Sequence, residues 1–89
     1  MKIEFDNTKN QHNIELRGLA FIDAGKLEWS TTMIWRDERF VYGEERFSAL
    51  AYLNRRLHFV AFTFIDEGIR VISFRKANKR EIKTYELQQ

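Results

Sequence analysis

The chain has 89 residues, 44% of them hydrophobic and 15% aromatic, and a formal net charge of +2. We expect one domain over residues 1–89, because this length suits one small core and aromatic side chains bury much area. The composition excludes a disordered protein, and the absence of cysteine excludes disulfides and thiol catalysis. The sequence has no apolar run of roughly 20 residues and no signal-peptide core at its N-terminus, so we expect a cytoplasmic protein without membrane contact.

The N-terminal part of the sequence predicts a short strand and a helix. Residues 2–5 alternate between polar and apolar side chains, as a half-buried strand does. Residues 7–17 fit a helix that begins after Asp6, a typical N-cap, and ends at Gly18, a typical left-handed C-cap. We expect Ile14 on the buried side of this helix.

A second short helix is expected over residues 19–24, ended by Gly25, and the two helices should pack together on a sheet. Residues 27–41 are interpreted as an irregular segment or a short strand, with a charged loop at residues 36–39.

The C-terminal half predicts an antiparallel meander and a final helix. Strand patterns cover residues 46–53, 57–65 and 69–74, with turns at residues 54–56 and 66–68, where Gly68 is available for a positive φ. Asn78 and Glu81 have the spacing of a capping box, and Ile82 and Tyr85 would form the inner face of the helix. The predicted fold is therefore α+β: an N-terminal helical pair on an antiparallel sheet of three to four strands, with a C-terminal helix.

Positive charge is concentrated near the C-terminus. Residues 70–89 carry six basic and two acidic side chains, whereas residues 1–69 carry nine basic and eleven acidic ones. Guanidinium and ammonium groups at the end of a sheet are good receptors for phosphate oxygens. The alternative is that these are solvated charges on an exposed helix. The basic residues at issue are Arg70, Arg75, Lys76, Lys79, Arg80 and Lys83.

Arg70 and Arg75 lie on opposite faces of a regular strand. Arg70 shares one face with Ile72 and Phe74, and Arg75 shares the other with Val71. The two guanidinium groups can therefore converge only if the strand bends or twists before Arg75.

Other residues offer weaker chemistry. The two histidines, His12 and His58, are far apart, and no metal-binding spacing or phosphate-binding glycine loop occurs, so we expect no metal and no cofactor. Two residues could move protons, namely His58 and Glu45, although packing and ion pairing are the alternative explanations. Trp29 and Trp35 could stack on RNA bases, or could belong to the core or to a partner interface; exposure of either would favour stacking.

The sequence resembles the BrnT toxins of bacterial type II toxin–antitoxin modules. The matching residues run in order along the chain: Phe5-Asp6 with Lys9 and Asn13, Gly18-Leu19 with Phe21, Tyr42-Gly43-Glu44-Glu45-Arg46-Phe47, Phe62-Thr63, Ile72-Ser73 with Arg75-Lys76-Ala77, and Arg80-Glu81 with Tyr85. The chain departs from the family at Phe5-Asp6-Asn7, where Trp-Asp-Pro is usual, and at Leu16-Arg17, where Lys-His is usual.

The resemblance implies a RelE-like fold and a metal-independent endoribonuclease that inhibits translation in the bacterial cytoplasm. It also implies a BrnA-like ribbon-helix-helix antitoxin, through which the complex binds operator DNA. Such an enzyme places the 2′-hydroxyl in line, neutralises the charge on phosphorus and moves protons. We expect the following roles: Arg70 and Arg75 on the scissile phosphate, Lys76 and Arg80 assisting, Glu45 or His58 in proton transfer, and Lys79, Lys83 and Arg17 in contact with RNA.

Two other functions remain open from the sequence. One is a non-catalytic toxin-like module that acts with an antitoxin on operon DNA, and the other is a small RNA- or DNA-binding domain that acts alone. Growth arrest on expression without the antitoxin would distinguish a toxin from the non-catalytic module. Salt-dependent RNA binding without cleavage would favour the nucleic-acid-binding domain that acts alone.

Overall fold

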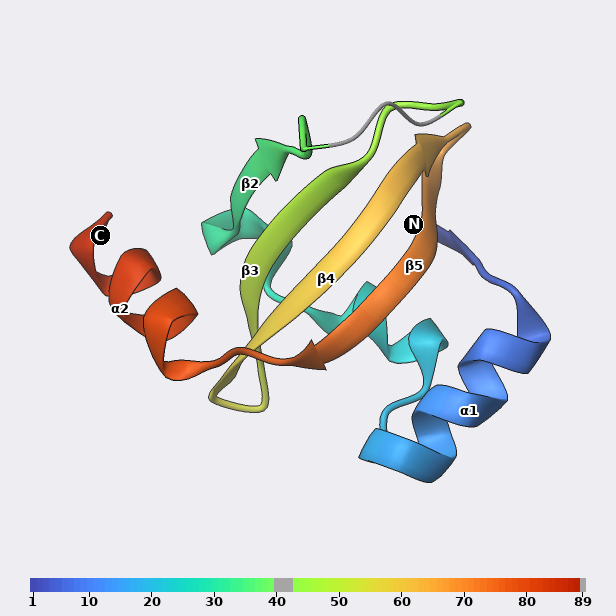
Figure 1. Ribbon diagram of the computed structural model, residues 1–89, viewed down its shortest axis with the longest axis horizontal. Helices are drawn as coiled ribbons and strands as arrows, with labels where there is room; N and C mark the ends of the chain where they lie inside the picture. The colour runs from blue at the N-terminus through green and yellow to red at the C-terminus, as the bar shows by residue number, and fades with distance from the viewer. Residues whose placement is uncertain (40–42, 89) are drawn as a thin grey trace.

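The computed structural model describes residues 1–39 and 43–88, and its centre is a five-stranded sheet (Figure 1). The strand order is β1-β5-β4-β3-β2, in which β1 is parallel to β5 and the other neighbouring pairs are antiparallel. The strands are β1 Lys2–Glu4, β2 Met33–Arg36, β3 Phe47–Leu53, β4 Arg56–Ile65 and β5 Gly68–Lys76. The α+β class is confirmed, but the expectation of three to four antiparallel strands is wrong, because β1 and β2 extend the meander at its two edges.

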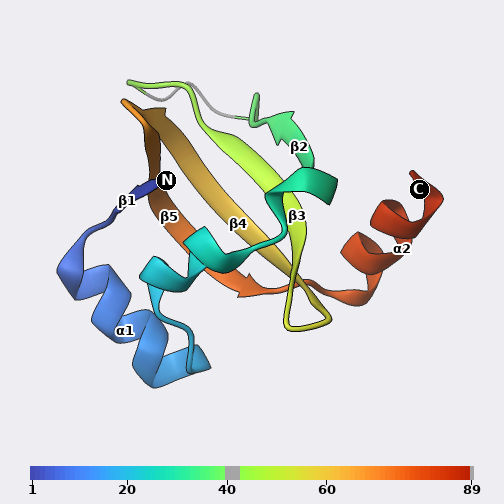
Figure 2. The same cartoon turned by 180° about the vertical axis from the view of Figure 1, so that it is seen from behind.

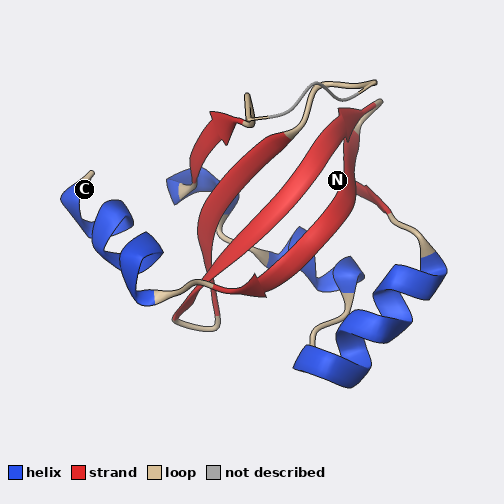
Figure 3. Ribbon diagram, in the orientation of Figure 1, coloured by secondary structure: helices blue, strands red, loops and turns tan. Residues whose placement is uncertain are grey.

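The helical elements lie on both sides of the sheet (Figures 2 and 3). On one side, which we call the α1 face, the sheet packs with Phe21, Ala24 and Leu27 into the larger core cluster. On the other side, the α2 face, a smaller cluster joins the sheet to the C-terminal helix through Leu50 and Tyr85. The elements are α1 Asn7–Arg17, the 3₁₀ helices η1 Phe21–Lys26 and η2 Trp29–Thr31, and α2 Lys79–Leu87.

Helix α1 has the predicted ends but a different buried residue. Asp6 accepts a hydrogen bond from the Lys9 amide at 2.8 Å, and Gly18 has a φ of 70°, so both caps are confirmed. Ile14 is 36% exposed, contrary to expectation, and Asn13 is buried in its place. The Asn13 side chain donates from Nδ2 to two backbone oxygens, that of Leu19 at 3.0 Å and that of Phe74 at 2.9 Å. An amide rather than an aliphatic side chain therefore joins α1 to β5.

The second helix is a 3₁₀ helix that continues past Gly25 to Lys26, so the prediction that Gly25 ends it is wrong. A Cβ at Gly25 would lie 3.3 Å from Ile3 Cγ1, which means that the glycine allows η1 to approach β1 closely. Residues 40–42, which include the end of the predicted irregular segment and Tyr42 of the matching motif, lie outside the described residues. Met33–Arg36 forms the strand β2 within that segment.

The turn between β4 and β5 uses a different residue from the one expected. Glu67 adopts the positive φ of 63°, whereas Gly68 lies in β5 opposite Lys2. A Cβ on Gly68 would come within 1.9 Å of the Lys2 carbonyl oxygen, so glycine is needed there for the close approach of β1.

The C-terminal helix begins as the sequence predicts. Asn78 and Glu81 form both hydrogen bonds of the capping box, and Tyr85 is 3% exposed with its hydroxyl donating to the Thr31 carbonyl oxygen at 2.7 Å. The hydrogen bond to Thr31 and the packing of Tyr85 with Leu50 hold α2 beside the sheet. Within the described residues, no helix has the length and hydropathy needed to cross a membrane.

Candidate active site

A β-bulge in β5 puts the two candidate arginines on the same face of the sheet. Phe62 pairs with Val71 but its neighbour Ala61 pairs with Ser73, so β5 contains one additional residue at Ile72. As a result Ile69, Val71 and Phe74 all enter the α1-face core. Arg70 and Arg75 therefore both lie on the α2 face, which a regular strand would not allow and which the irregularity before Arg75 makes possible.

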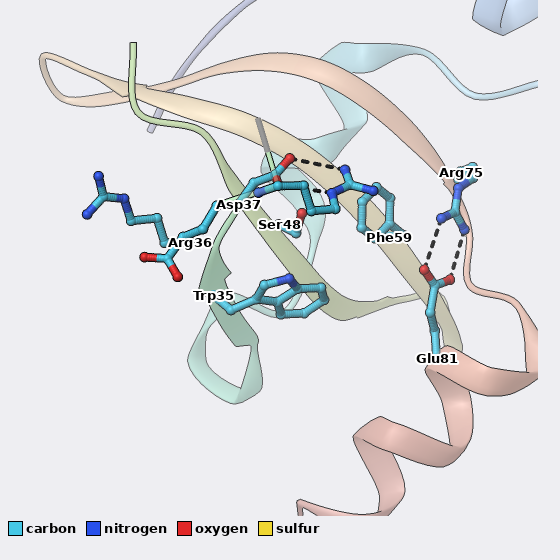
Figure 4. Close-up of a pocket in the computed structure, with 9 residues that line it drawn as sticks. Trp35, Arg36, Asp37, Ser48, Phe59, Arg75 and Glu81 are labelled. Carbon is cyan, nitrogen blue, oxygen red and sulfur yellow. Dashed lines mark hydrogen bonds and ion pairs between the residues drawn. The ribbon is translucent and has the colours of Figure 1, made fainter. Parts of the chain in front are cut away.

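Arg75 is held firmly on the α2 face (Figure 4). Its Nη1 and Nη2 donate to Glu81 Oε1 at 2.8 Å and Oε2 at 2.9 Å, and Nη1 also approaches the Lys76 carbonyl oxygen at 3.2 Å. The guanidinium carbon lies 4.3 Å from the centre of the Phe59 ring, a cation–π contact. The fork to Glu81 and the ring below it fix both the position and the plane of the guanidinium group.

Glu81 connects the start of α2 to this arginine. Its carboxylate accepts from the Asn78 amide at 2.9 Å as well as from Arg75. The hydrogen bond from Arg75 is the main cause that lowers the pKa of Glu81, against the opposing effect of burial. Glu81 is therefore ionised at neutral pH and suited to holding Arg75, whereas a carboxylate with a lowered pKa is a weak base.

Glu81→Gln is expected to lower the free energy of unfolding at pH 7 by about 1–2 kcal/mol, since glutamine keeps the capping box but loses the charge-assisted fork. A carboxyl whose pKa is lowered in the folded state stabilises the fold above its unfolded pKa, roughly 4.3, and loses that contribution as the pH falls through its folded pKa. The difference between wild type and variant should therefore shrink below about pH 4.3. Urea unfolding from pH 7 to pH 3 measures it, with Glu86→Gln in the same helix as control. A difference that stays constant to pH 3 would contradict this assignment.

A hollow of about 270 Å³ opens beside Arg75 on the α2 face (Figure 4). Trp35 from β2 and Phe59 from β4 face it, with ring centres 6.4 Å apart, and Ser48 of β3 lies between them in the sheet. The hollow is lined by Trp35, Arg36, Asp37, Glu38, Arg39, Ser48, Phe59, Arg75 and Glu81.

A second depression, of about 300 Å³, also borders Arg75. It is lined by Arg17 at the end of α1, by Leu19, and by Arg75 and Lys76 at the end of β5. Three of the residues that the sequence nominated for RNA contact or catalysis, from two distant segments, thus border one site. Their charges are all positive, as a phosphate-binding site requires.

Arg70 shares the face of Arg75 but not its surroundings. It pairs with Glu4 at 3.2 Å and with Glu44 at 3.6 Å. Arg70 lies opposite Thr63 and Arg75 opposite Phe59, four residues apart on β4, which corresponds to about 13 Å along the strand. The bulge aligns the two side chains, but they do not surround a common point.

The two proton-transfer candidates lie in contrasting surroundings. The His58 side chain is 3% exposed, packs against Phe74 on the α1 face, and has Nδ1 at 2.7 Å from the Arg56 carbonyl oxygen. Burial lowers the pKa of His58, so the ring is neutral at neutral pH. Glu45 is exposed and pairs at 3.3 Å with Arg36, which lines the hollow.

The remaining basic candidates, Lys79, Arg80 and Lys83, are exposed on α2. Among the described residues, no group of three or more histidine, aspartate or glutamate side chains is arranged to hold a metal ion. The sequence reasoning missed Phe59 and the partnership of Arg75 with Glu81. The sequence pattern places Glu81 in the helix cap alone, and its position six residues after Arg75 is the signal that also fits an ion pair.

A family model described as the ribonuclease toxin BrnT of type II toxin–antitoxin systems matches residues 5–81. The match includes every residue that borders the hollow and the basic depression. No curated protein matches the chain.

Proposed function

The chain belongs to the family of BrnT ribonuclease toxins of type II toxin–antitoxin systems, and we propose that it cleaves RNA without a metal ion, using Arg75 to bind the scissile phosphate. The observation that carries this proposal is the fixed guanidinium group of Arg75, which borders both the aromatic hollow and the basic depression. Such a toxin would have a RelE-like architecture and would stop translation by cutting RNA.

Arg75 can bind a phosphate without releasing Glu81. A guanidinium group has five N–H donors, and Glu81 and the Lys76 carbonyl oxygen occupy three of them. The N–H of Nε and the second hydrogen of Nη2 have no protein acceptor among the described residues. These two donors would hold the non-bridging oxygens, while Arg17 and Lys76 would hold the neighbouring phosphate in the basic depression.

The proposed reaction is an internal transfer. The 2′-oxygen loses its proton and attacks phosphorus, the bond from phosphorus to the 5′-oxygen breaks, and the 5′-oxygen takes up a proton. The products are a 2′,3′-cyclic phosphate and a 5′-hydroxyl. Arg75 would stabilise the negative charge that builds up on the non-bridging oxygens in the transition state, an interaction that is worth more in a fixed site than in water.

Of the two proton-transfer candidates, Glu45 is the one we retain. Its carboxylate is exposed and pairs with Arg36, one of the residues that line the hollow, whereas the His58 ring is buried on the α1 face. Arg80, Lys79 and Lys83 would extend the basic surface along α2.

A type II family has an antitoxin partner, and we propose a BrnA-like ribbon-helix-helix protein through which the complex binds operator DNA.

The test is cleavage of a single-stranded RNA by the purified chain in excess EDTA. We expect full activity and products that end in a 2′,3′-cyclic phosphate, identified by mass spectrometry. The matched control is the same sequence with 2′-O-methyl groups, which lacks the nucleophile and should stay intact. Activity that requires an added divalent ion, or cleavage of the methylated RNA, would overturn the proposal.

A further inference from the structure

Phosphate binding leaves the aromatic hollow without a function. The hollow and the basic depression both border Arg75, but their linings differ in kind. Arg17, Arg75 and Lys76 give the depression positive charge alone. The hollow instead combines two aromatic rings with equal numbers of acidic and basic side chains: Asp37, Glu38 and Glu81 against Arg36, Arg39 and Arg75. Such a lining is unsuited to a phosphate and suited to a neutral, planar group with hydrogen-bonding edges.

Trp35 supplies the surface on which such a group could stack. Its side chain is 38% exposed on the edge strand β2 and faces the hollow (Figure 4). Phe59 supports it from one side, with the two rings inclined at 52°. Trp29 differs, because it packs edge-on against Phe62 at 5.6 Å and donates from Nε1 to the Ala24 carbonyl oxygen. Of the two tryptophans, Trp35 is therefore the one that can contact a ligand.

Polar groups around the hollow could contact the edge of a base. Asp37 accepts from Arg39 Nε and Nη2 at 3.0 and 3.1 Å and from the Arg39 amide at 3.1 Å, and its side chain is 9% exposed, so its part is to hold Arg39 at the hollow. Ser48 places a hydroxyl next to Trp35 in the sheet and is 4% exposed. A hydroxyl both donates and accepts hydrogen bonds, so Ser48 can pair with either kind of group on the edge of a nucleobase.

We propose that this hollow binds one unpaired RNA base, stacked on Trp35, while Arg75 holds the phosphate attached to that nucleotide. The inference rests on the proposed ribonuclease function and adds a base site to it. Stacking on an aromatic side chain tolerates any base, whereas phosphate binding alone cannot tell a nucleotide from a bare sugar-phosphate chain. The site therefore selects single-stranded RNA, because a base in a duplex is stacked and paired on both sides.

The test measures binding separately from cleavage. The probe is a short 2′-O-methyl RNA, which is not cut, and the comparison probe is an abasic oligomer of the same length. Trp35→Ala is expected to bind the base-containing probe roughly 5- to 150-fold more weakly, and Trp35→Phe to recover most of the loss. Neither variant should change binding of the abasic probe. Quenching of tryptophan fluorescence by the base-containing probe should disappear in both variants, because Trp29 is partly buried against Phe62 on the α1 face, away from the hollow.

Ile34→Ala is the matched control, since Ile34 is the neighbouring apolar residue of β2, is 45% exposed and points to the opposite face. It should bind both probes like wild type. Equal binding of the base-containing probe by Trp35→Ala and wild type, or equal weakening for both probes, would overturn the base site. Cleavage of ordinary RNA by wild type in that case would leave the ribonuclease function standing. Binding that depends on Trp35 without any cleavage would support the base site and contradict the ribonuclease function.

Discussion

Replacing Arg75 by alanine is expected to lower the rate of RNA cleavage by about 10²- to 10³-fold, the loss typical of removing one fixed donor from a transition state. The reason is geometric as well as electrostatic. Glu81 and the Phe59 ring hold the guanidinium group before RNA arrives, so no reorganisation is needed during the reaction. Arg75→Lys should recover little activity, because a single ammonium group cannot form the fork to Glu81 and bind phosphate at the same time. The measurement is a single-turnover cleavage rate at saturating protein.

Arg80→Ala is the matched comparison on α2. Arg80 is exposed one residue before Glu81 and has no ion pair among the described residues, so the variant should lose less activity than Arg75→Ala. Both variants must keep the wild-type circular dichroism spectrum and a cooperative unfolding transition, because Arg75 also contributes to packing. Wild-type rates in both folded variants would exclude this assignment of the phosphate site.

Features that depend on neighbours in the sequence could be predicted from it. Asp6 and Gly18 end α1 as expected, and Asn78 with Glu81 begins α2, because a cap is formed by hydrogen bonds within one turn. The hairpin strands were also predicted, since alternating apolar residues bring adjacent segments together across short turns. The resemblance to the BrnT family came from the same sequence, through motifs that the family match includes.

Features that depend on distant partners could not be predicted. The bulge at Ile72 arises from the register between β4 and β5. It places Arg75 on the same face of the sheet as Arg70, although the residue types of the strand do not mark it. The parallel edge strand β1 pairs with residues 68–70, and three alternating residues do not specify such a partner. The fork between Arg75 and Glu81 has the same origin, because it forms where β5 turns into α2.

Asn13→Asp is expected to lower the free energy of unfolding at pH 7 by about 3–5 kcal/mol, although it only exchanges the side-chain amide nitrogen for an oxygen. The amide nitrogen of Asn13 donates to two carbonyl oxygens, those of Leu19 and Phe74. A carboxylate of the same shape has no donor, so it would place a buried negative charge against two acceptors. Asn13→Ala leaves the two oxygens unpaired without adding charge and should cost about 2–3 kcal/mol. Urea unfolding of the purified variants measures both losses.

The pH dependence separates the charge from the lost hydrogen bonds. Burial near carbonyl oxygens would raise the pKa of an aspartate at position 13 above its unfolded value of roughly 3.9. The folded variant would then bind its proton more tightly than the unfolded chain, so its stability relative to wild type should rise as the pH falls from 7 toward 4. The deficit of Asn13→Ala should change little over the same range, and Asn7→Asp at the exposed start of α1 should stay within about 0.5 kcal/mol of wild type. Since Phe74 precedes Arg75, cleavage by Asn13→Asp should weaken in parallel with its stability. An Asn13→Asp variant as stable as wild type at pH 7 would mean that the amide does not hold α1 against β5.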